Sequence, residues 1–281
     1  LAAQPIVRTA YEEPKRTFDT NLGGTVNVLE CVRNSSFVEA AVIITSDKCY
    51  ENVGIARGYR EDDRLGGEDP YSAAKACAEI ACSAYYRSFF CHQDKTRLAM
   101  ARAGNVIGGG DWAKDRIIPD CVRAWSQGKT AIIRNPKATR PWQHVLEPLS
   151  GYLWLGACLL KGNKKLVGEA FNFGPYQKAS KDVGTLADLF VSFWGKAAWE
   201  HVLAGGKKKE ALLLQLSPQK TKTMMAWRAS LSFRETVEFT ALWYKQYYGK
   251  KVNMMDLSCQ QINAYIQKAE SLNLAWTKGL S

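Results

Sequence analysis

The segment Ala40-Ala41-Val42-Ile43-Ile44-Thr45-Ser46-Asp47-Lys48 decides the fold class of this chain. Its first six residues are apolar or β-branched, which is typical of a parallel strand buried on both faces. A helix is predicted from about residue 70 to 90, and a second strand at Arg97–Arg102. This alternation of strand, helix and strand predicts a doubly wound α/β sheet. In such sheets the sites lie at the carboxyl ends of the strands, where the polar residues after Ile44 stand.

The predicted helix carries Tyr71-Ser72-Ala73-Ala74-Lys75, with Asp69 as its N-cap and Pro70 as its first residue. A Tyr and a Lys four residues apart share one helix face. A neighbouring cation favours the phenolate, so we expect the pKa of Tyr71 to lie below the usual value of about 10. Such a group can act as a general base toward a hydroxyl. A Tyr and a Lys at this spacing are weak evidence for a catalytic site when they stand alone. Their interpretation depends on Ser46 and Asp47.

The composition is that of an ordinary globular protein. The chain has 281 residues, of which 46% are hydrophobic and 23% charged, and this length suits one large or two modest domains. No apolar run approaches the roughly 18 residues of a membrane span. No signal peptide is visible, and the missing initiator Met leads us to expect further sequence upstream. Eight scattered cysteines without metal-ligand spacing predict a reducing, cytoplasmic location and no metal site.

The formal charge of +11 leaves two interpretations open. Basic clusters at Lys161–Lys165 and Lys207–Lys209 could bind nucleic acid, but no basic helix or aromatic RNA-binding motif accompanies them. Solvated loops, with some charge facing an anionic small substrate, are the favoured interpretation. We therefore expect neither a nucleic-acid nor a membrane partner.

The rest of the chain is less regular. The hydrophobic pattern predicts helices at Asn21–Val32, Ile117–Ser126, His144–Leu160 and near Phe233–Tyr248, and strands at Thr130–Arg134 and Glu169–Gly174. We expect residues 1–110 to form the remainder of a dinucleotide-binding domain. Residues 111–281 are then mostly a smaller substrate domain, with some segments returning to the sheet.

Six motifs occur in the order found in one enzyme family. They are Leu1-Ala-Ala-Gln-Pro5, Thr20-Asn-Leu-Gly-Gly-Thr25, Thr45-Ser-Asp-Lys-Cys-Tyr-Glu-Asn52, Asp69-Pro-Tyr-Ser-Ala-Ala-Lys75, Arg102-Ala-Gly-Asn-Val-Ile-Gly-Gly-Gly-Asp-Trp112 and Arg140-Pro-Trp-Gln-His-Val145. With these the chain resembles the extended short-chain dehydrogenase/reductase family, and within it the CDP-glucose 4,6-dehydratases. The Thr-Ser-Asp-Lys and Gly-Gly-Asp-Trp forms favour the CDP-sugar branch, since related dTDP-sugar enzymes have Asp-Glu after the Thr. The resemblance is specific up to residue 175 and looser beyond it.

The resemblance implies a mechanism in which NAD is used and regenerated. Tyr71 takes the proton of the C4 hydroxyl while hydride leaves C4, with Lys75 assisting and Ser46 hydrogen-bonded to the C4 oxygen. The resulting keto group acidifies C5–H. Asp47 is then the candidate acid for the departing C6 hydroxyl, and Lys48 the candidate base at C5. Ser46 and Asp47 could instead cap a turn, and Lys48 could be a solvated surface charge.

The resemblance also implies the residues that bind the cofactor and the substrate. Those on the NAD side are Ala2, Ala3, Asn21, Thr45, Tyr71 and Lys75. Those that hold the CDP-sugar are Asn105, Arg116 and Arg140, where a planar guanidinium fork suits two diphosphate oxygens. His144 is expected to pack structurally. The implied assembly is a homodimer joined through long helices that include residues 70–90.

The chain departs from the family pattern at its beginning. The family opens with a strand, a Gly-rich phosphate loop and a helix that holds the pyrophosphate. These 281 residues lack that unit, and Gly108-Gly109-Gly110 does not replace it because the GxGxxG spacing is absent. We therefore expect a Rossmann-like sheet without its N-terminal βα units, and weak NAD binding by this chain. Other nucleotide-sugar 4,6-dehydratases, a 4-epimerase, and an inert homologue that only binds sugar nucleotide remain as alternatives.

Overall fold

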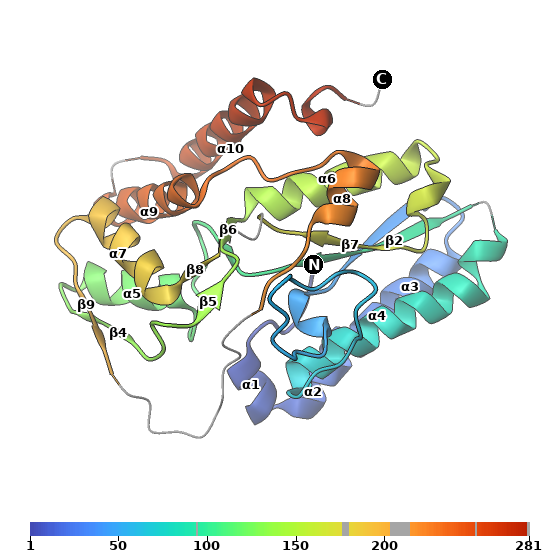
Figure 1. Cartoon of the computed structure of the whole chain (residues 1–281), viewed down its shortest axis with the longest axis horizontal. Coiled ribbons are helices and arrows are strands. Elements are labelled where there is room, and N and C mark those ends of the chain that lie inside the picture. Colours follow the sequence, from blue (N-terminus) through green and yellow to red (C-terminus); the bar gives the residue numbers. More distant parts are fainter. Residues whose placement is uncertain (94, 176–179, 203–213, 251, 280–281) are drawn as a thin grey trace.

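The structure is a computed structural model that describes residues 1–281 apart from 94, 176–179, 203–213, 251 and 280–281 (Figure 1). Its central sheet has three parallel strands in the order β1-β2-β7: β1 is Ala40–Ile44, β2 is Arg97–Ala103 and β7 is Ala170–Phe173. The strands predicted at 40–45, 97–102 and 169–174 are therefore confirmed. Parallel neighbours need crossover connections, and a long helix supplies the one between β1 and β2.

Helices cover both faces of this sheet (Figure 1). On one face lie α3 (Gly24–Asn34) and α4 (Pro70–Ser88), and on the other lies α6 (Leu146–Leu160). The segment that contains α6 and β7 thus returns to the sheet, although both follow residue 110. The domain boundary at residue 110 stays a prediction.

The side chains of β2 alternate between these two layers. Leu98 and Met100 pack in the cluster that contains α3 and α4, whereas Ala99 and Ala101 pack against α6. Successive side chains of a strand point to opposite faces, so the unbroken apolar run from Leu98 to Ala101 suits a sheet covered on both sides.

The helix α4 begins where the sequence predicted. Asp69 accepts hydrogen bonds from the backbone N–H groups of Tyr71, at 2.9 Å, and Ser72, at 3.0 Å, and Pro70 is the first helical residue. Just before it, Gly67 lies so close to the first turn that an added Cβ would stand 2.5 Å from the Ala73 nitrogen. The cap and this close approach fix where the Tyr71 turn lies.

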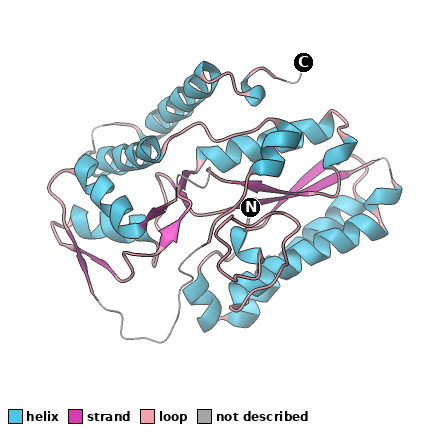
Figure 2. Cartoon of the chain, viewed as in Figure 1, coloured by secondary structure: helices cyan, strands magenta, loops and turns pink. Residues whose placement is uncertain are grey.

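A second group of helices forms its own core beside the sheet (Figure 2). It contains α5 (Ile117–Ser126), α7 (Val183–Trp194) and α9 (Phe233–Gly249). Trp125 and Phe190 meet there with ring centroids 5.5 Å apart, inside a larger buried apolar cluster. The helices predicted at 117–126 and near 233–248 are confirmed.

The remaining elements are short or peripheral, except for one terminal helix. They are α1 (Val7–Glu12), α2 (Pro14–Phe18), η1 (Asp19–Gly23), η2 (Asp47–Cys49), η3 (Phe90–His92), β3 (Val106–Ile107), β4 (Ala131–Ile133), β5 (Thr139–Arg140), β6 (Gln143–His144), η4 (Lys164–Leu166), β8 (Lys181–Asp182), β9 (Trp199–His201), α8 (Gln219–Met225), α10 (Met254–Ser271) and η6 (Ala275–Thr277). The pairs β3–β6 and β4–β9 are parallel, and β5–β8 is antiparallel.

The helix predicted at His144–Leu160 is two residues too long at its start. His144 lies in β6 and pairs with Ile107, while Val145 donates its backbone N–H to the Ile107 oxygen at 2.9 Å. These ladder contacts hold the backbone in a strand until α6 begins at Leu146. The lysines at 161, 164 and 165 are exposed as expected, and Lys207–Lys209 lie outside the described residues.

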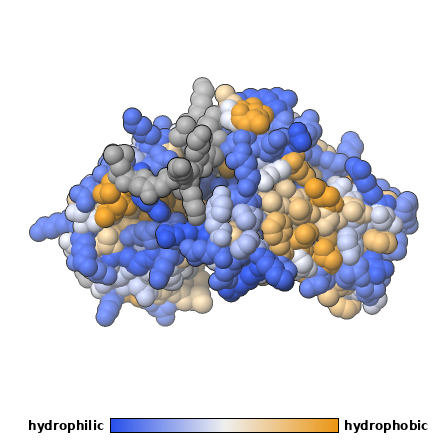
Figure 3. Space-filling model, turned by 90° about the horizontal axis from the view of Figure 1, so that it is seen from below, coloured by the Kyte–Doolittle hydropathy of each residue, from blue (hydrophilic) through white to orange (hydrophobic). Residues whose placement is uncertain are grey.

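One outer face of the sheet domain is apolar. Val28 of α3 is 49% exposed and Ile80 of α4 is 57% exposed. Figure 3 shows apolar side chains on the side of the molecule where these two helices lie. None of the helices in the described ranges is long and apolar enough to cross a membrane.

Candidate active site

The ends of β1 and β2 and the first turn of α4 bring the predicted catalytic residues together. Ser46 follows β1 and caps the short helix η2: its Oγ accepts from the Lys48 backbone N–H at 3.2 Å. The same hydroxyl donates to Asp47 Oδ1 at 3.0 Å. Gly104, after β2, closes the site from the other side, because an added Cβ would stand 2.9 Å from Pro141 Cγ and 3.5 Å from Asp47 Oδ2. Only a glycine allows this approach without a shift.

Asp47 is held in an environment that favours its protonated form. The residue is 3% exposed, and its Oδ2 makes no hydrogen bond to any described residue. Burial raises the pKa of the carboxyl above its usual range, while Lys48, the Ser46 hydroxyl and Arg140 oppose the shift. A carboxyl with a raised pKa holds its proton to higher pH and can donate it to a leaving hydroxyl.

Tyr71 lies in the same cluster, but its pKa departs from the expected direction. We expected Lys75 to lower it, and instead burial raises the pKa of Tyr71 to about 12. The Ser46 hydroxyl lowers it, the charge of Asp47 raises it further, and Arg116 lowers it. The expectation is wrong because sequence spacing carries no information on desolvation, which is the largest of these effects.

Lys75 lies on the buried side of α4, and its ammonium points toward the sheet. Its Nζ donates to the backbone oxygen of Ile44, at the end of β1, at a long distance of 3.4 Å. Burial lowers the pKa of Lys75, and Glu79 one turn later raises it. An ammonium has three donors, so others remain for a ligand beside the end of β1. Lys48 is half-buried next to Asp47, and its role as a base stays a prediction.

Two arginines reach this cluster from separate elements. Arg140, in β5, is 8% exposed, and it donates to the Thr139 backbone oxygen at 2.8 Å. Arg116 precedes α5 and donates to Asp111 Oδ2 at 2.8 Å. The two guanidinium charges act on Asp47 and Tyr71, so the structure brings all four residues into one site. Their substrate contacts stay predictions.

The remaining polar positions are arranged around the site. The Asn105 backbone oxygen accepts from Gln143 at 3.1 Å, which joins the end of β2 to β6. His144 is buried, and burial lowers its pKa to about 4, so it is neutral near pH 7. Its Nδ1 accepts from the Leu146 backbone N–H at 3.4 Å, which agrees with a structural role.

The residues predicted to bind the cofactor include two near the start of the chain, Ala2 and Ala3. The Asn21 side chain is buried and accepts from the Gln4 backbone N–H at 2.8 Å, while it donates to the Gln4 oxygen at 3.0 Å. This pair of bonds fixes the segment that carries Ala2 and Ala3. The Thr45 hydroxyl donates to Glu79. Cofactor contacts by these four residues stay predictions.

Sequence analysis missed two features of the site. Tyr152, on α6, packs edge-on against Phe173 with ring centroids 5.5 Å apart. Burial raises its pKa, and the charges of Asp47 and Tyr71 raise it further. In the sequence it is one more apolar position of a helix. The second feature is the buried pair of Glu79 and Arg102, which are 23 residues apart and carry no local signal.

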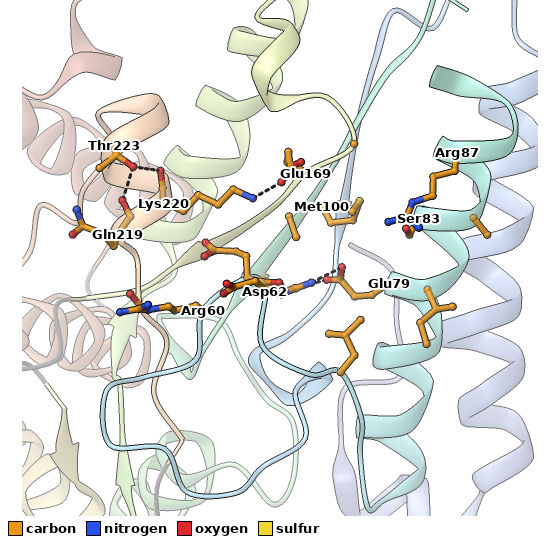
Figure 4. A pocket seen from close by; sticks show the side chains of 18 residues that line it. Arg60, Asp62, Glu79, Ser83, Arg87, Met100, Glu169, Gln219, Lys220 and Thr223 are labelled. Atoms are coloured by element: carbon orange, nitrogen blue, oxygen red, sulfur yellow. Dashed lines mark hydrogen bonds and ion pairs between the residues drawn. The ribbon is translucent and has the colours of Figure 1, made fainter. Parts of the chain in front are cut away.

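The structure also has a cavity of about 1020 Å³ between α4, the start of β7 and α8 (Figure 4). Glu79 points inward from α4, and on the side opposite this helix Lys220 of α8 donates to Glu169 at 2.5 Å. None of the predicted catalytic residues lines it. Among the described residues no group of three or more His, Cys, Asp or Glu side chains could hold a metal ion.

Two comparisons with known proteins match this chain to nucleotide-sugar 4,6-dehydratases. A family model described as GDP-mannose 4,6 dehydratase matches residues 1–240. The CDP-glucose 4,6-dehydratase of Salmonella typhimurium is 43% identical over 270 residues, which are 95% of this chain and 75% of that protein.

Two solved structures show the same fold. The UDP-glucuronic acid 4-epimerase from Bacillus cereus, in complex with UDP-glucuronic acid and NAD, has a TM-score of 0.75 at 20% identity, and the match covers 88% of this chain and 74% of that one. The dTDP-glucose 4,6-dehydratase from Bacillus anthracis, in complex with NAD, has a TM-score of 0.68 at 23% identity, covering 82% and 69%. The predicted Rossmann-like α/β fold class is thereby confirmed.

Proposed function

Because this chain belongs to the GDP-mannose 4,6-dehydratase family, we propose that it dehydrates CDP-glucose to CDP-4-keto-6-deoxyglucose with NAD as a regenerated cofactor. The observation that carries the proposal is the 43% identity to a CDP-glucose 4,6-dehydratase over 95% of the chain. The cluster of Ser46, Asp47 and Tyr71 supports it, because it places a proton acceptor and a proton donor in one site.

The residues present fit such a cofactor beside the end of β1. Lys75 has donors left for the two neighbouring hydroxyls of a ribose. Asn21 fixes the segment of Ala2 and Ala3, which the family resemblance assigns to cofactor binding. When bound, NAD supplies a hydride acceptor for C4 and later a hydride donor for C6. The other steps fall to residues of this chain.

Proton transfer divides among three side chains. Tyr71 takes the proton of the C4 hydroxyl. Ser46 hydrogen-bonds the C4 oxygen and also lowers the pKa of Tyr71. Lys48 takes the proton of C5, which the new 4-keto group has acidified. Asp47, whose carboxyl pKa is raised by burial, donates to the C6 hydroxyl as water leaves.

Arg116 and Arg140 are the proposed holders of the diphosphate. Both are fixed by hydrogen bonds, to Asp111 and to the Thr139 oxygen, before any substrate binds. A guanidinium fork that is already oriented binds two phosphate oxygens with little further ordering. The amide of Asn105, at the end of β2, is the proposed contact to the sugar.

We also propose a homodimer that is joined through α3 and α4, and a cytoplasmic location. The exposed apolar residues Val28 and Ile80 support the first, because a water-exposed apolar face on two neighbouring helices suits burial against a second copy. All eight cysteines are free thiols, which suits a reducing compartment.

The proposal is tested by incubating the chain with CDP-glucose and NAD and following the product by mass spectrometry. We expect a sugar nucleotide lighter by one water and carrying a 4-keto group. Tyr71→Phe should lower this turnover by roughly 10²–10⁴-fold, because it removes the general base, while CDP-glucose still binds. Product from dTDP- or GDP-glucose alone would refute the CDP assignment, and a product of unchanged mass would indicate a 4-epimerase.

A further inference from the structure

A buried ion pair lies one helical turn beyond Lys75. Arg102 of β2 donates to Glu79 of α4 through Nε to Oε1 at 2.8 Å and through Nη2 to Oε2 at 3.0 Å. The two side chains are 4% and 1% exposed. Two parallel charge-assisted bonds of this kind fix the relative orientation of both groups, and here they join the catalytic helix to the middle of the sheet.

The Glu79 side of the pair holds the residue before the catalytic segment. The Thr45 hydroxyl donates to Glu79 Oε1, and the Thr45 backbone N–H donates to the Ala101 oxygen at 2.9 Å. Thr45 is 7% exposed and immediately precedes Ser46. The end of β1 is thus fixed to α4 and to β2 at one point.

The Arg102 side of the pair holds the residue after the same segment. Its Nη1 donates to the Tyr50 hydroxyl at 2.6 Å, and the guanidinium carbon lies 4.8 Å from the centre of the Tyr50 ring. The Tyr50 hydroxyl in turn donates to Asn172 Oδ1 at 2.8 Å, on β7. Residues 46–49, which carry Ser46 and Asp47, are therefore bracketed by two residues that bind one ion pair.

Stability alone does not account for a pair in this position. Replacing a buried ion pair by apolar residues of similar volume is often neutral or stabilising, because desolvation offsets the attraction between the charges. The bidentate geometry instead gives orientation. Side chains that hold a reacting group are effective when they fix it to within about 0.5 Å.

We infer that Glu79 and Arg102 are positioning residues, which fix the segment 46–49 against the Tyr71–Lys75 turn of α4. The inference deepens the proposed dehydration and rests on it for a readout of activity. The position of the segment has a second readout that needs no turnover, because the Asp47 carboxyl titrates above its usual range only while it stays buried.

The test compares Tyr50→Phe and Glu79→Gln with a matched control, Tyr59→Phe. Tyr50→Phe keeps the ring and removes the two bonds of the hydroxyl, from Arg102 and to Asn172. Tyr59 is as deeply buried and its ring stacks on Tyr50 at 5.1 Å, but its hydroxyl donates to Asn52 at 2.9 Å and does not touch the pair. Steady-state kinetics with CDP-glucose and NAD are measured on each variant, and a carboxyl ¹³C NMR titration follows Asp47.

We expect Tyr50→Phe and Glu79→Gln to lower kcat by roughly 10–100-fold, with KM for CDP-glucose within about threefold, since a displaced catalytic group costs rate more than binding. In both, the midpoint of the Asp47 titration should fall toward the usual range of an aspartate. Tyr59→Phe should keep kcat within about twofold and leave the titration unchanged, whatever its effect on stability.

Four outcomes are informative. An Asp47 titration that is the same in Tyr50→Phe as in the unaltered chain overturns the inference, and so does an equal loss of kcat in Tyr59→Phe. If Glu79→Gln does not fold, Tyr50→Phe alone decides. If the unaltered chain does not turn over CDP-glucose, the proposed function fails, while the titrations still support or overturn the positioning role.

Discussion

Replacing Glu147 by glutamine should remove a contribution to folding stability that falls by about 3 kcal/mol as the pH rises from about 4.5 to 7. Glu147 begins α6 and is 1% exposed. Its Oε1 accepts from the backbone N–H groups of Ser230, at 2.8 Å, and Leu231, at 2.6 Å, and its Oε2 accepts from the Tyr265 hydroxyl at 2.8 Å. Burial outweighs these three bonds and raises the pKa of the carboxyl from 4.5 to about 7.

The sign and size of the effect follow from linkage. The folded state holds the proton of Glu147 up to about pH 7, and the unfolded state releases it near pH 4.5. The stabilisation is therefore fully present below pH 4.5 and is lost as the pH rises through about 7. At 1.36 kcal/mol for each pKa unit, the loss comes to about 3 kcal/mol.

The measurement is urea unfolding of both proteins at several pH values, with the difference in free energy of unfolding plotted against pH. The difference isolates Glu147, because other titrating groups contribute equally to both chains. Glutamine can accept the same two backbone bonds and donate to Tyr265, whose hydroxyl also lies 2.9 Å from Ser150 Oγ. A difference that stays constant from pH 4.5 to 8 would refute the reasoning, because it would mean that Glu147 titrates alike in both states.

Three further predictions concern the site, its helix and the assembly. Asp47→Asn should slow water loss by roughly 10²–10⁴-fold, since the amide cannot donate the proton, and reduced nicotinamide should accumulate in an absorbance assay; a normal rate would exclude Asp47 as the acid. Gly67→Ala should destabilise the fold by about 1–3 kcal/mol in urea unfolding, because its Cβ would stand 2.5 Å from the backbone of α4. The control Gly156→Ala should not destabilise it, because that Cβ meets nothing closer than 3.9 Å. Ile80→Glu should turn the proposed dimer into a monomer, as measured by light scattering. The control Leu153→Glu changes a residue that is 76% exposed on α6, and it should leave the dimer mass unchanged. Equal masses for both variants would contradict the proposed interface.

The elements that sequence predicted best are those whose signals are local. The strand at β1 has a β-branched apolar run, and α4 has its Asp69 cap and Pro70 within two residues of the start. Both signals act within a few residues, so distant parts of the chain cannot cancel them. The start of α6 was predicted too early because the strand pairing of His144 with Ile107 joins residues 37 positions apart in the chain.

The proximity of Ser46, Asp47 and Tyr71 was predicted from the sequence, but their electrostatics were not. Motif spacing placed Ser46, Asp47 and Tyr71 together, because the ends of parallel strands meet at one edge of a sheet. The direction of the Tyr71 pKa could not be predicted in this way, since desolvation depends on everything packed around the ring. The pairing of Glu79 with Arg102 depends likewise on the register between a helix and a strand.

Burial acts on Asp47 and Tyr71 in the same direction, although the two are proposed to do opposite work. It favours the protonated form of each, which suits Asp47 as a donor and opposes Tyr71 as an acceptor. The rise of the Tyr71 pKa from 10 to about 12 disfavours its phenolate by about 3 kcal/mol. Positive charge near the phenol must offset this when the C4 proton leaves. The value of about 12 already includes the charge of Arg116, which precedes α5. The oxidised nicotinamide, beside Lys75, would supply the further positive charge. Under the proposed mechanism, Tyr71 is a strong base only when the cofactor is bound, so proton removal at C4 is coupled to the presence of the group that accepts the hydride.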